Sequence, residues 1–143
     1  MPRVAPLALV VALAVAGAAC GSGKQSAPVV VTMAGEVVAT SKLLTIAAGV
    51  CAAARQAATD THAAYQTFFG QSHDGIHLIA RGLQTNDRDA AATLLETKVK
   101  VEEDFVNPNP PAPRLAADLL RLAAVTRTSL AHFKVHADAC PSS

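Results

Sequence analysis

The stretch LAADLLRLAAVTRTSLAHF, residues 115–133, carries the clearest helical pattern in the chain. Leu115, Leu119 and Leu122 are three or four positions apart, so a helix places them on one face. The same spacing continues beyond this stretch, and we expect a helix over residues 113–138. Its inward face is predicted to carry Leu115, Leu119, Leu122, Thr126, Leu130, Phe133, Ala137 and Cys140. This pattern predicts a long amphipathic helix with a continuous buried stripe.

Three earlier segments have the same periodicity and extend the prediction to the whole domain. We expect helices over residues 41–70, 72–84 and 87–106, with Ser41, Ser72 and either Asn86 or Asp87 as N-caps. Gly70 is expected to end the first of these helices. Four amphipathic helices with mostly short connections favour an all-α fold, an antiparallel up-down-up-down four-helix bundle over residues 42–143.

The first nineteen residues have the order of a bacterial signal peptide. Arg3 is the only charge before Lys24, and an apolar run of Ala, Val and Leu follows it and ends in small residues. This run is shorter than the roughly 20 residues that a membrane-spanning helix needs. We therefore expect residues 1–19 to direct export rather than to span a membrane.

The junction Ala18-Ala19-Cys20-Gly21 resembles the lipobox of bacterial lipoproteins. The resemblance covers the leader alone, and Gly17 stands where the family usually has an aliphatic residue. It implies cleavage before Cys20 and attachment of a diacylglyceryl group and a further fatty acid such as palmitate to that residue. The protein is then held by lipid on the extracytoplasmic face of the cell membrane. The alternative is ordinary cleavage after residues 17–19, which leaves Cys20 as a free thiol.

The number of cysteines favours the lipid-anchored alternative. The chain has three, Cys20, Cys51 and Cys140, and an exported protein usually pairs its cysteines. If Cys20 carries lipid, the other two remain as one pair. Both fall on predicted inward faces of the first and last helices, so we expect a Cys51–Cys140 disulfide. Two buried unpaired thiols are the alternative.

Between the leader and the helices, residues 20–41 are predicted to form a tether. The segment Gly21 to Pro28 is small, polar and typical of a flexible linker. Residues 29–32 are β-branched, so a short strand or hairpin is the alternative to an extended linker here. At the other end of the domain, the proline-rich segment 107–113 predicts a stiff connection between two helices.

Composition excludes several classes of function. The net charge is +1 and there is no basic block, which argues against a nucleic-acid partner. The five aromatic residues (Tyr65, Phe68, Phe69, Phe105 and Phe133) fall on predicted core stripes, so a stacking platform is not expected. Glu102, Glu103 and Asp104 are interpreted as a solvated surface, because consecutive carboxylates point to different sides of a helix. Motifs for nucleophilic, zinc-protease or phosphate-loop chemistry are absent from the sequence, and we expect no enzymatic activity.

Five histidines are the one unusual feature for chemistry. His73 and His77, like His132 and His136, are four residues apart and share a helix face. In the predicted bundle the second pair lies at the opposite end from the first. A zinc or copper site is therefore conceivable from His62, His73 and His77, with Asp74 or Asp60 nearby. The alternative is that these are half-buried or surface histidines with no metal.

Two hypotheses follow from the sequence. The first is a lipid-anchored binding or interaction module that presents a helix face or the proline-rich connection to an envelope protein. The second is an extracytoplasmic zinc- or copper-binding protein that uses the histidines named above.

Overall fold

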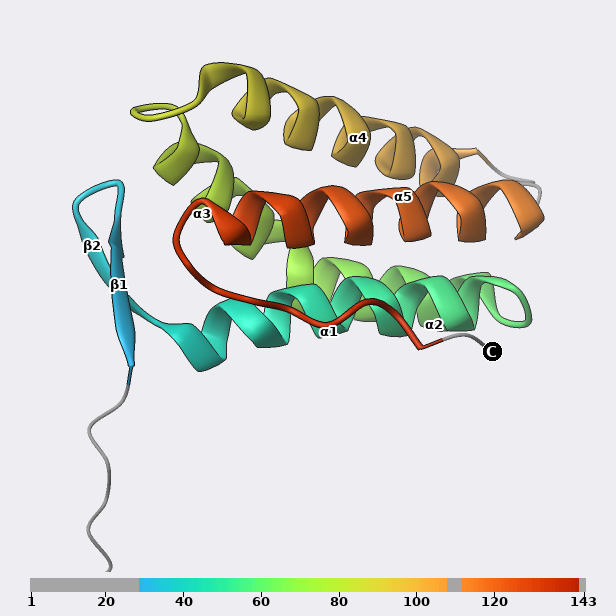
Figure 1. Ribbon diagram of the computed structural model, residues 1–143. Helices are drawn as coiled ribbons and strands as arrows, with labels where there is room; N and C mark the ends of the chain where they lie inside the picture. The colour runs from blue at the N-terminus through green and yellow to red at the C-terminus, as the bar shows by residue number, and fades with distance from the viewer. Residues whose placement is uncertain (1–28, 108–111, 142–143) are drawn as a thin grey trace, which may run out of the picture.

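The computed structural model describes residues 29–107 and 112–141, which form a helical bundle and a small two-stranded sheet (Figure 1). The elements, in chain order, are β1 (Val30–Met33), β2 (Glu36–Ala39), α1 (Thr40–Ala57), α2 (Thr61–Thr67), the π-helical turn η1 (Phe68–Ser72), α3 (His73–Leu83), α4 (Arg88–Val106) and α5 (Ala112–Ala131). The predicted signal peptide, Cys20 and most of the proline-rich connection lie outside these residues. In the part of the chain that is described, no helix is both long and apolar enough to cross a bilayer.

Residues 30–39 form an antiparallel hairpin, so the preferred prediction of an extended linker is wrong for this part of the tether. Val31 pairs with Val38, and the turn uses Gly35 at φ 80°, a conformation that glycine adopts without steric cost. Met33 and Val38 are buried. A Cβ atom on Gly82 of α3 would lie 2.8 Å from the Cβ of Met33. The hairpin therefore gains stability by packing one face on the bundle, a contribution that the linker composition did not reveal.

The first predicted helix is broken into two. It begins at Thr40, after Ala39 and without a side-chain cap, and α1 ends at Ala57. The chain then turns, and Asp60 caps α2 by accepting a hydrogen bond of 2.9 Å from the backbone N–H of Ala63. The alanine-rich composition favoured one helix through this region, but the strong cap at Asp60 starts a new one.

The predicted stop at Gly70 is absent, because η1 carries the helix on into α3. Gly70 has no neighbour within 4 Å of a would-be Cβ. Ser72 is buried and donates its hydroxyl to the carbonyl of Ile46 at 2.9 Å, so it holds α1 instead of capping α3. A Cβ on Gly75 would overlap Ile46. The inserted π turn thus lies against α1 at Ile46, next to the point where Gly75 of α3 packs on the side chain of the same residue.

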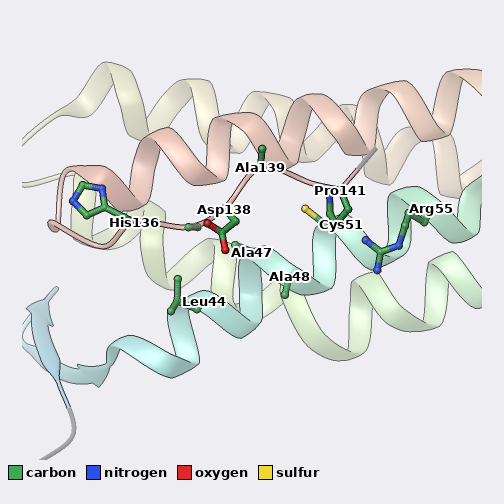
Figure 2. Close-up of a pocket in the computed structure, with 10 residues that line it drawn as sticks. Leu44, Ala47, Ala48, Cys51, Arg55, His136, Asp138, Ala139 and Pro141 are labelled. Atoms are coloured by element: carbon green, nitrogen blue, oxygen red, sulfur yellow. The ribbon is translucent and has the colours of Figure 1, made fainter. Parts of the chain in front are cut away.

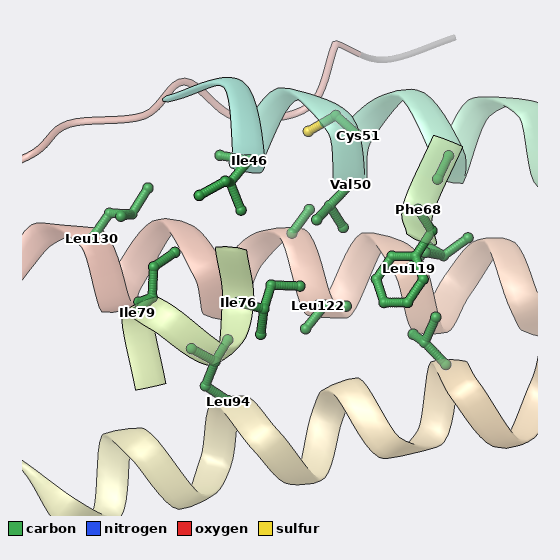
Figure 3. Packing of buried hydrophobic residues seen from close by; sticks show 14 of the residues in the cluster. Ile46, Val50, Cys51, Phe68, Ile76, Ile79, Leu94, Leu119, Leu122 and Leu130 are labelled. Atoms are coloured by element: carbon green, nitrogen blue, oxygen red, sulfur yellow. The ribbon is translucent and has the colours of Figure 1, made fainter. Parts of the chain in front are cut away.

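The core is built around α5, which packs against both α1 and α4. Leu119, Leu122 and Leu130 are fully buried, as predicted (Figure 3). The figure shows them between Ile46 and Val50 of α1 on one side and Leu94 of α4 on the other, with Ile76 and Ile79 of α3 completing the cluster. Asp87 caps α4 by accepting from the N–H of Ala90, again as predicted.

Tyr65, which was predicted to lie on a core stripe, is 44% exposed, and Leu44 of α1 is 38% exposed. Tyr65 lies in α2, whose helical phase is reset by the break at residues 58–60.

The last helix ends at Ala131, earlier than the predicted residue 138. Lys134 adopts φ 59°, and the N–H of Val135 bonds back to the carbonyl of Leu130 at 3.1 Å. Val135 is buried on the core. Residues 135–141, called the C-terminal segment from here on, then run extended beside α1 (Figure 1).

Candidate functional site

The C-terminal segment is fixed to the bundle at both ends. The first fixed point is the buried side chain of Val135. The second is a disulfide between Cys140 and Cys51 of α1, whose Cα atoms are 5.3 Å apart. The predicted cysteine pair is therefore confirmed. Cys140 reaches its partner from an extended segment and not from the end of a helix, so the predicted route to this bond was wrong.

A groove lies between α1 and the C-terminal segment, and we refer to it as the α1 groove (Figure 2). Its volume is about 390 Å³, and it is lined by Leu44, Ala47, Ala48, Cys51 and Arg55 of α1, by residues 136–139 and by Pro141. In Figure 2, His136 and Leu44 lie toward one end and Arg55 toward the other. Small alanines on α1 leave this hollow, because bulkier side chains at those positions would fill it.

The α1 groove combines an apolar floor with separated charges. Ala47, Ala48 and Leu44 supply apolar surface. Arg55 is exposed and has no ion-pair partner among residues 29–107 and 112–141. Asp138 is likewise exposed and unpaired within those ranges. A concave surface that combines apolar side chains with a few polar groups is a candidate binding site.

A second cluster of polar groups surrounds His73, the first residue of α3. Its Nε2 lies 2.8 Å from Oε1 of Glu102 on α4, and its Nδ1 lies 3.0 Å from Oδ1 of Asp74. The imidazole ring stacks on Phe69 with 5.0 Å between ring centroids. Lys98, only 3% exposed, donates to the same Glu102 oxygen at 2.6 Å. These contacts tie α3 to α4 through one carboxylate.

The electrostatics of this cluster follow from its burial and its charges. Burial alone would raise the pKa of Glu102, but hydrogen bonds from Lys98 and His73 outweigh it and lower the pKa. Burial lowers the pKa of His77, and the neighbouring positive charges of Lys98 and His73 lower it further. The hydrogen bond from His73 lowers the pKa of Asp74. The cluster therefore favours ionised carboxylates and an uncharged His77.

The histidines predicted as metal ligands are not brought together into a metal-binding group. His73 and His77 are in ring contact, with centroids 5.1 Å apart. His62 instead lies 3.0 Å from the side-chain nitrogen of Gln66, in α2, and Asp60 caps that helix. Within the described ranges, no three His, Cys, Asp or Glu side chains are placed so that they could hold a metal ion.

The acidic run 102–104 is not the solvated surface that the sequence predicted. Asp104 is 2% exposed and its Oδ1 lies 3.0 Å from Nε of Arg114 on α5. Burial, and then the neighbouring Asp118, raise the pKa of Asp104. Consecutive carboxylates do point to different sides of the helix, as expected: Glu102 contacts His73 of α3, and Asp104 contacts Arg114 of α5.

Sequence reasoning missed Arg55, Lys98 and Glu102. The spacing of Lys98 and Glu102, four apart on one helix, is a recognisable signal for an ion pair. Arg55 had no such signal, because its position beside the α1 groove depends on where the C-terminal segment returns.

No protein-family model matches this chain, and neither curated proteins nor solved structures show a significant similarity to it.

Proposed function

We propose that this protein is an exported, lipid-anchored binding module of the bacterial cell envelope, with the α1 groove as its binding surface. The observation that carries the proposal is the disulfide between Cys51 and Cys140. Disulfides persist outside the reducing cytosol, and this pair leaves Cys20 as the one remaining cysteine of the three. With those two cysteines bonded to each other, we assign acylation to Cys20.

In this proposal the domain is an antiparallel up-down-up-down bundle. Its first, third and fourth helices are α1, α4 and α5, and the continuous run of α2, η1 and α3 takes the place of the second helix. The packing of α5 on α1 and α4, and of α4 on α3, supports that arrangement. The anchor holds the bundle on the extracytoplasmic face of the membrane, and its role there is recognition of an envelope protein and not catalysis. A near-neutral net charge is consistent with a protein partner and not with nucleic acid.

Mass spectrometry of the amino-terminal peptide from the native host tests the anchor. We expect an acylated Cys20 and a protein that sediments with membranes. Cys20→Ser should shift the protein to the soluble fraction. The matched control is the double variant Cys51→Ala plus Cys140→Ala, which should stay with the membranes. An unmodified amino end on membrane-free protein contradicts the proposal.

The alternative is zinc or copper binding, and the contact between His73 and His77 is the observation in its favour. Two imidazoles four apart on α3 can supply two ligands, and a second molecule or solvent must supply the others. A thermal melt with added Zn²⁺ or Cu²⁺ tests this role. A rise in Tm that is lost in the variant His73→Ala plus His77→Ala supports it, and an unchanged Tm in the unmodified protein excludes it.

A further inference from the structure

We propose that the α1 groove takes an extended peptide, which adds as a strand to the C-terminal segment and places a carboxylate on Arg55. This inference rests on the proposed function, because it names the class of ligand for the binding surface given there. It follows from the backbone of the C-terminal segment, the length of the groove and the distribution of charge in it.

The backbone of the C-terminal segment is extended and has free hydrogen-bonding groups. Beyond Val135, no hydrogen bond to residues 136–141 is formed by any residue that the structure describes. Side chains alternate over its first four residues, with Val135 buried, His136 exposed, Ala137 half-buried and Asp138 exposed. An extended strand with unpaired N–H and C=O groups is a template for another strand. Recognition by strand addition uses such an edge for affinity and the adjacent pockets for specificity.

The dimensions of the α1 groove fit a short strand. Leu44 lies near one end, and seven positions further along α1 the Cys51–Cys140 disulfide holds the two walls together, with 5.3 Å between the Cα atoms. At a rise of about 1.5 Å per residue, the space between these points is about 10 Å long along the helix axis. An extended chain advances about 3.3 Å per residue, so about three residues cover this distance, and Arg55 lies one turn beyond the disulfide. The alanines of the floor, Ala47 and Ala48, suit small aliphatic side chains on alternate positions.

Charge sets the direction in which the peptide lies. Arg55 is an exposed and unpaired guanidinium at one end of the groove, and a carboxylate is its natural partner. Asp138 lies in the wall between the two ends, where its negative charge disfavours a carboxylate (Figure 2). The acidic end of the peptide is therefore placed at Arg55 and its uncharged part along Ala47 and Leu44.

Nuclear magnetic resonance of the full-length, detergent-solubilised protein tests the inference. The probe is a pool of acetylated peptides of about three residues, built from Ala and Val and ending in a free carboxylate. Two comparison pools have the same side chains. In the first the peptides end in a carboxamide instead of a carboxylate, and in the second the backbone nitrogens are methylated and cannot donate hydrogen bonds. We expect the carboxylate pool to shift the amide resonances of residues 136–139, and the N-methylated pool to leave them unchanged.

Substitution of Arg55 separates charge recognition from strand addition. Arg55→Gln should weaken binding of the carboxylate pool about fivefold and leave the carboxamide pool unaffected. Arg127→Gln, on an exposed position of α5, is the matched control and should bind as the unmodified protein does. Equal binding of the N-methylated pool overturns the inference. The absence of any resonance shift at residues 136–139 also overturns the inference. A shift that appears without peptide and depends on protein concentration overturns it too, because it indicates that a second copy of the protein binds there.

The outcome of the peptide titration can be told apart from the outcome of the mass-spectrometric test of lipid attachment at Cys20. An acylated Cys20 with no response to peptide removes the peptide ligand and leaves the anchored module in place. A peptide response in protein whose amino end is unmodified supports the inference and removes the anchor.

Discussion

Cys51 and Cys140 are 89 residues apart in sequence, and their Cα atoms are 5.3 Å apart. The bond between them closes almost the whole helical domain into one loop and fixes the C-terminal segment on α1. The stability of the domain and the shape of the α1 groove therefore depend on the same covalent link.

Removing this disulfide should lower stability strongly. A loop of this length restricts the unfolded chain, and the variant Cys51→Ala plus Cys140→Ala should lose about 4 kcal/mol of unfolding free energy. Urea denaturation measures the change. Amide exchange at residues 136–141 should also become much faster in the variant, while exchange in α4 changes only with global stability. An unchanged denaturation midpoint would show that the bond does not form in the protein.

Gly75 should not tolerate a side chain, whereas Gly70 should. A Cβ at Gly75 overlaps the buried side chain of Ile46, so Gly75→Ala should cost about 1–3 kcal/mol. Gly70 faces open space within a continuous helix, and Gly70→Ala should raise stability by about 0.5–1 kcal/mol. Thermal melts of the two variants measure both effects. A stabilised Gly75→Ala protein contradicts the close approach of α1 and α3.

Glu102 should matter chiefly because it neutralises a buried cation. Removing it in Glu102→Ala leaves Lys98 buried and without its 2.6 Å partner, at a cost of about 2 kcal/mol. Adding Lys98→Met should recover most of that loss, because the replacement is apolar and of similar length. Denaturation of the single and double variants gives the coupling free energy. Additive losses in the double variant would exclude the buried pair.

His77 should make the protein less stable in mild acid. Its pKa in the folded state is lowered from the ordinary 6.5, so the folded state binds a proton less readily than the unfolded state does. The contribution of neutral His77 to the free energy of unfolding is therefore fully present above pH 6.5, and it is lost as the pH falls through the pKa of His77 in the folded state. Denaturation at about pH 7.5 and about pH 5.5 measures the loss, which should be smaller in His77→Gln. His136→Gln, on the exposed C-terminal segment, is the control and should behave as the unmodified protein.

Much of the helical architecture was predictable, because burial and periodicity are local properties of the sequence. Leu115, Leu119 and Leu122 repeat at helical spacing, and they are fully buried in α5. Asp87 carries the signal of an N-cap and is one. The break before α2 was missed because the preceding alanines favour helix as strongly as Asp60 favours a new start.

The α1 groove could not be predicted, because it depends on where the last helix ends. Phe133, Ala137 and Cys140 continue the helical spacing, whereas the structure turns the chain at Lys134 with a positive φ. A lysine in that conformation has no sequence signature. Cysteine parity nevertheless identified the Cys51–Cys140 pair, since it depends on chemistry and not on local conformation.

The double attachment of the C-terminal segment has a kinetic consequence for recognition. Since Val135 and Cys140 fix this wall of the α1 groove when the protein folds, the peptide proposed above would meet a surface that is already ordered. Binding would then reduce the conformational entropy of the protein only slightly. We therefore expect the complex to form in one kinetic step, without a slow rearrangement of the protein.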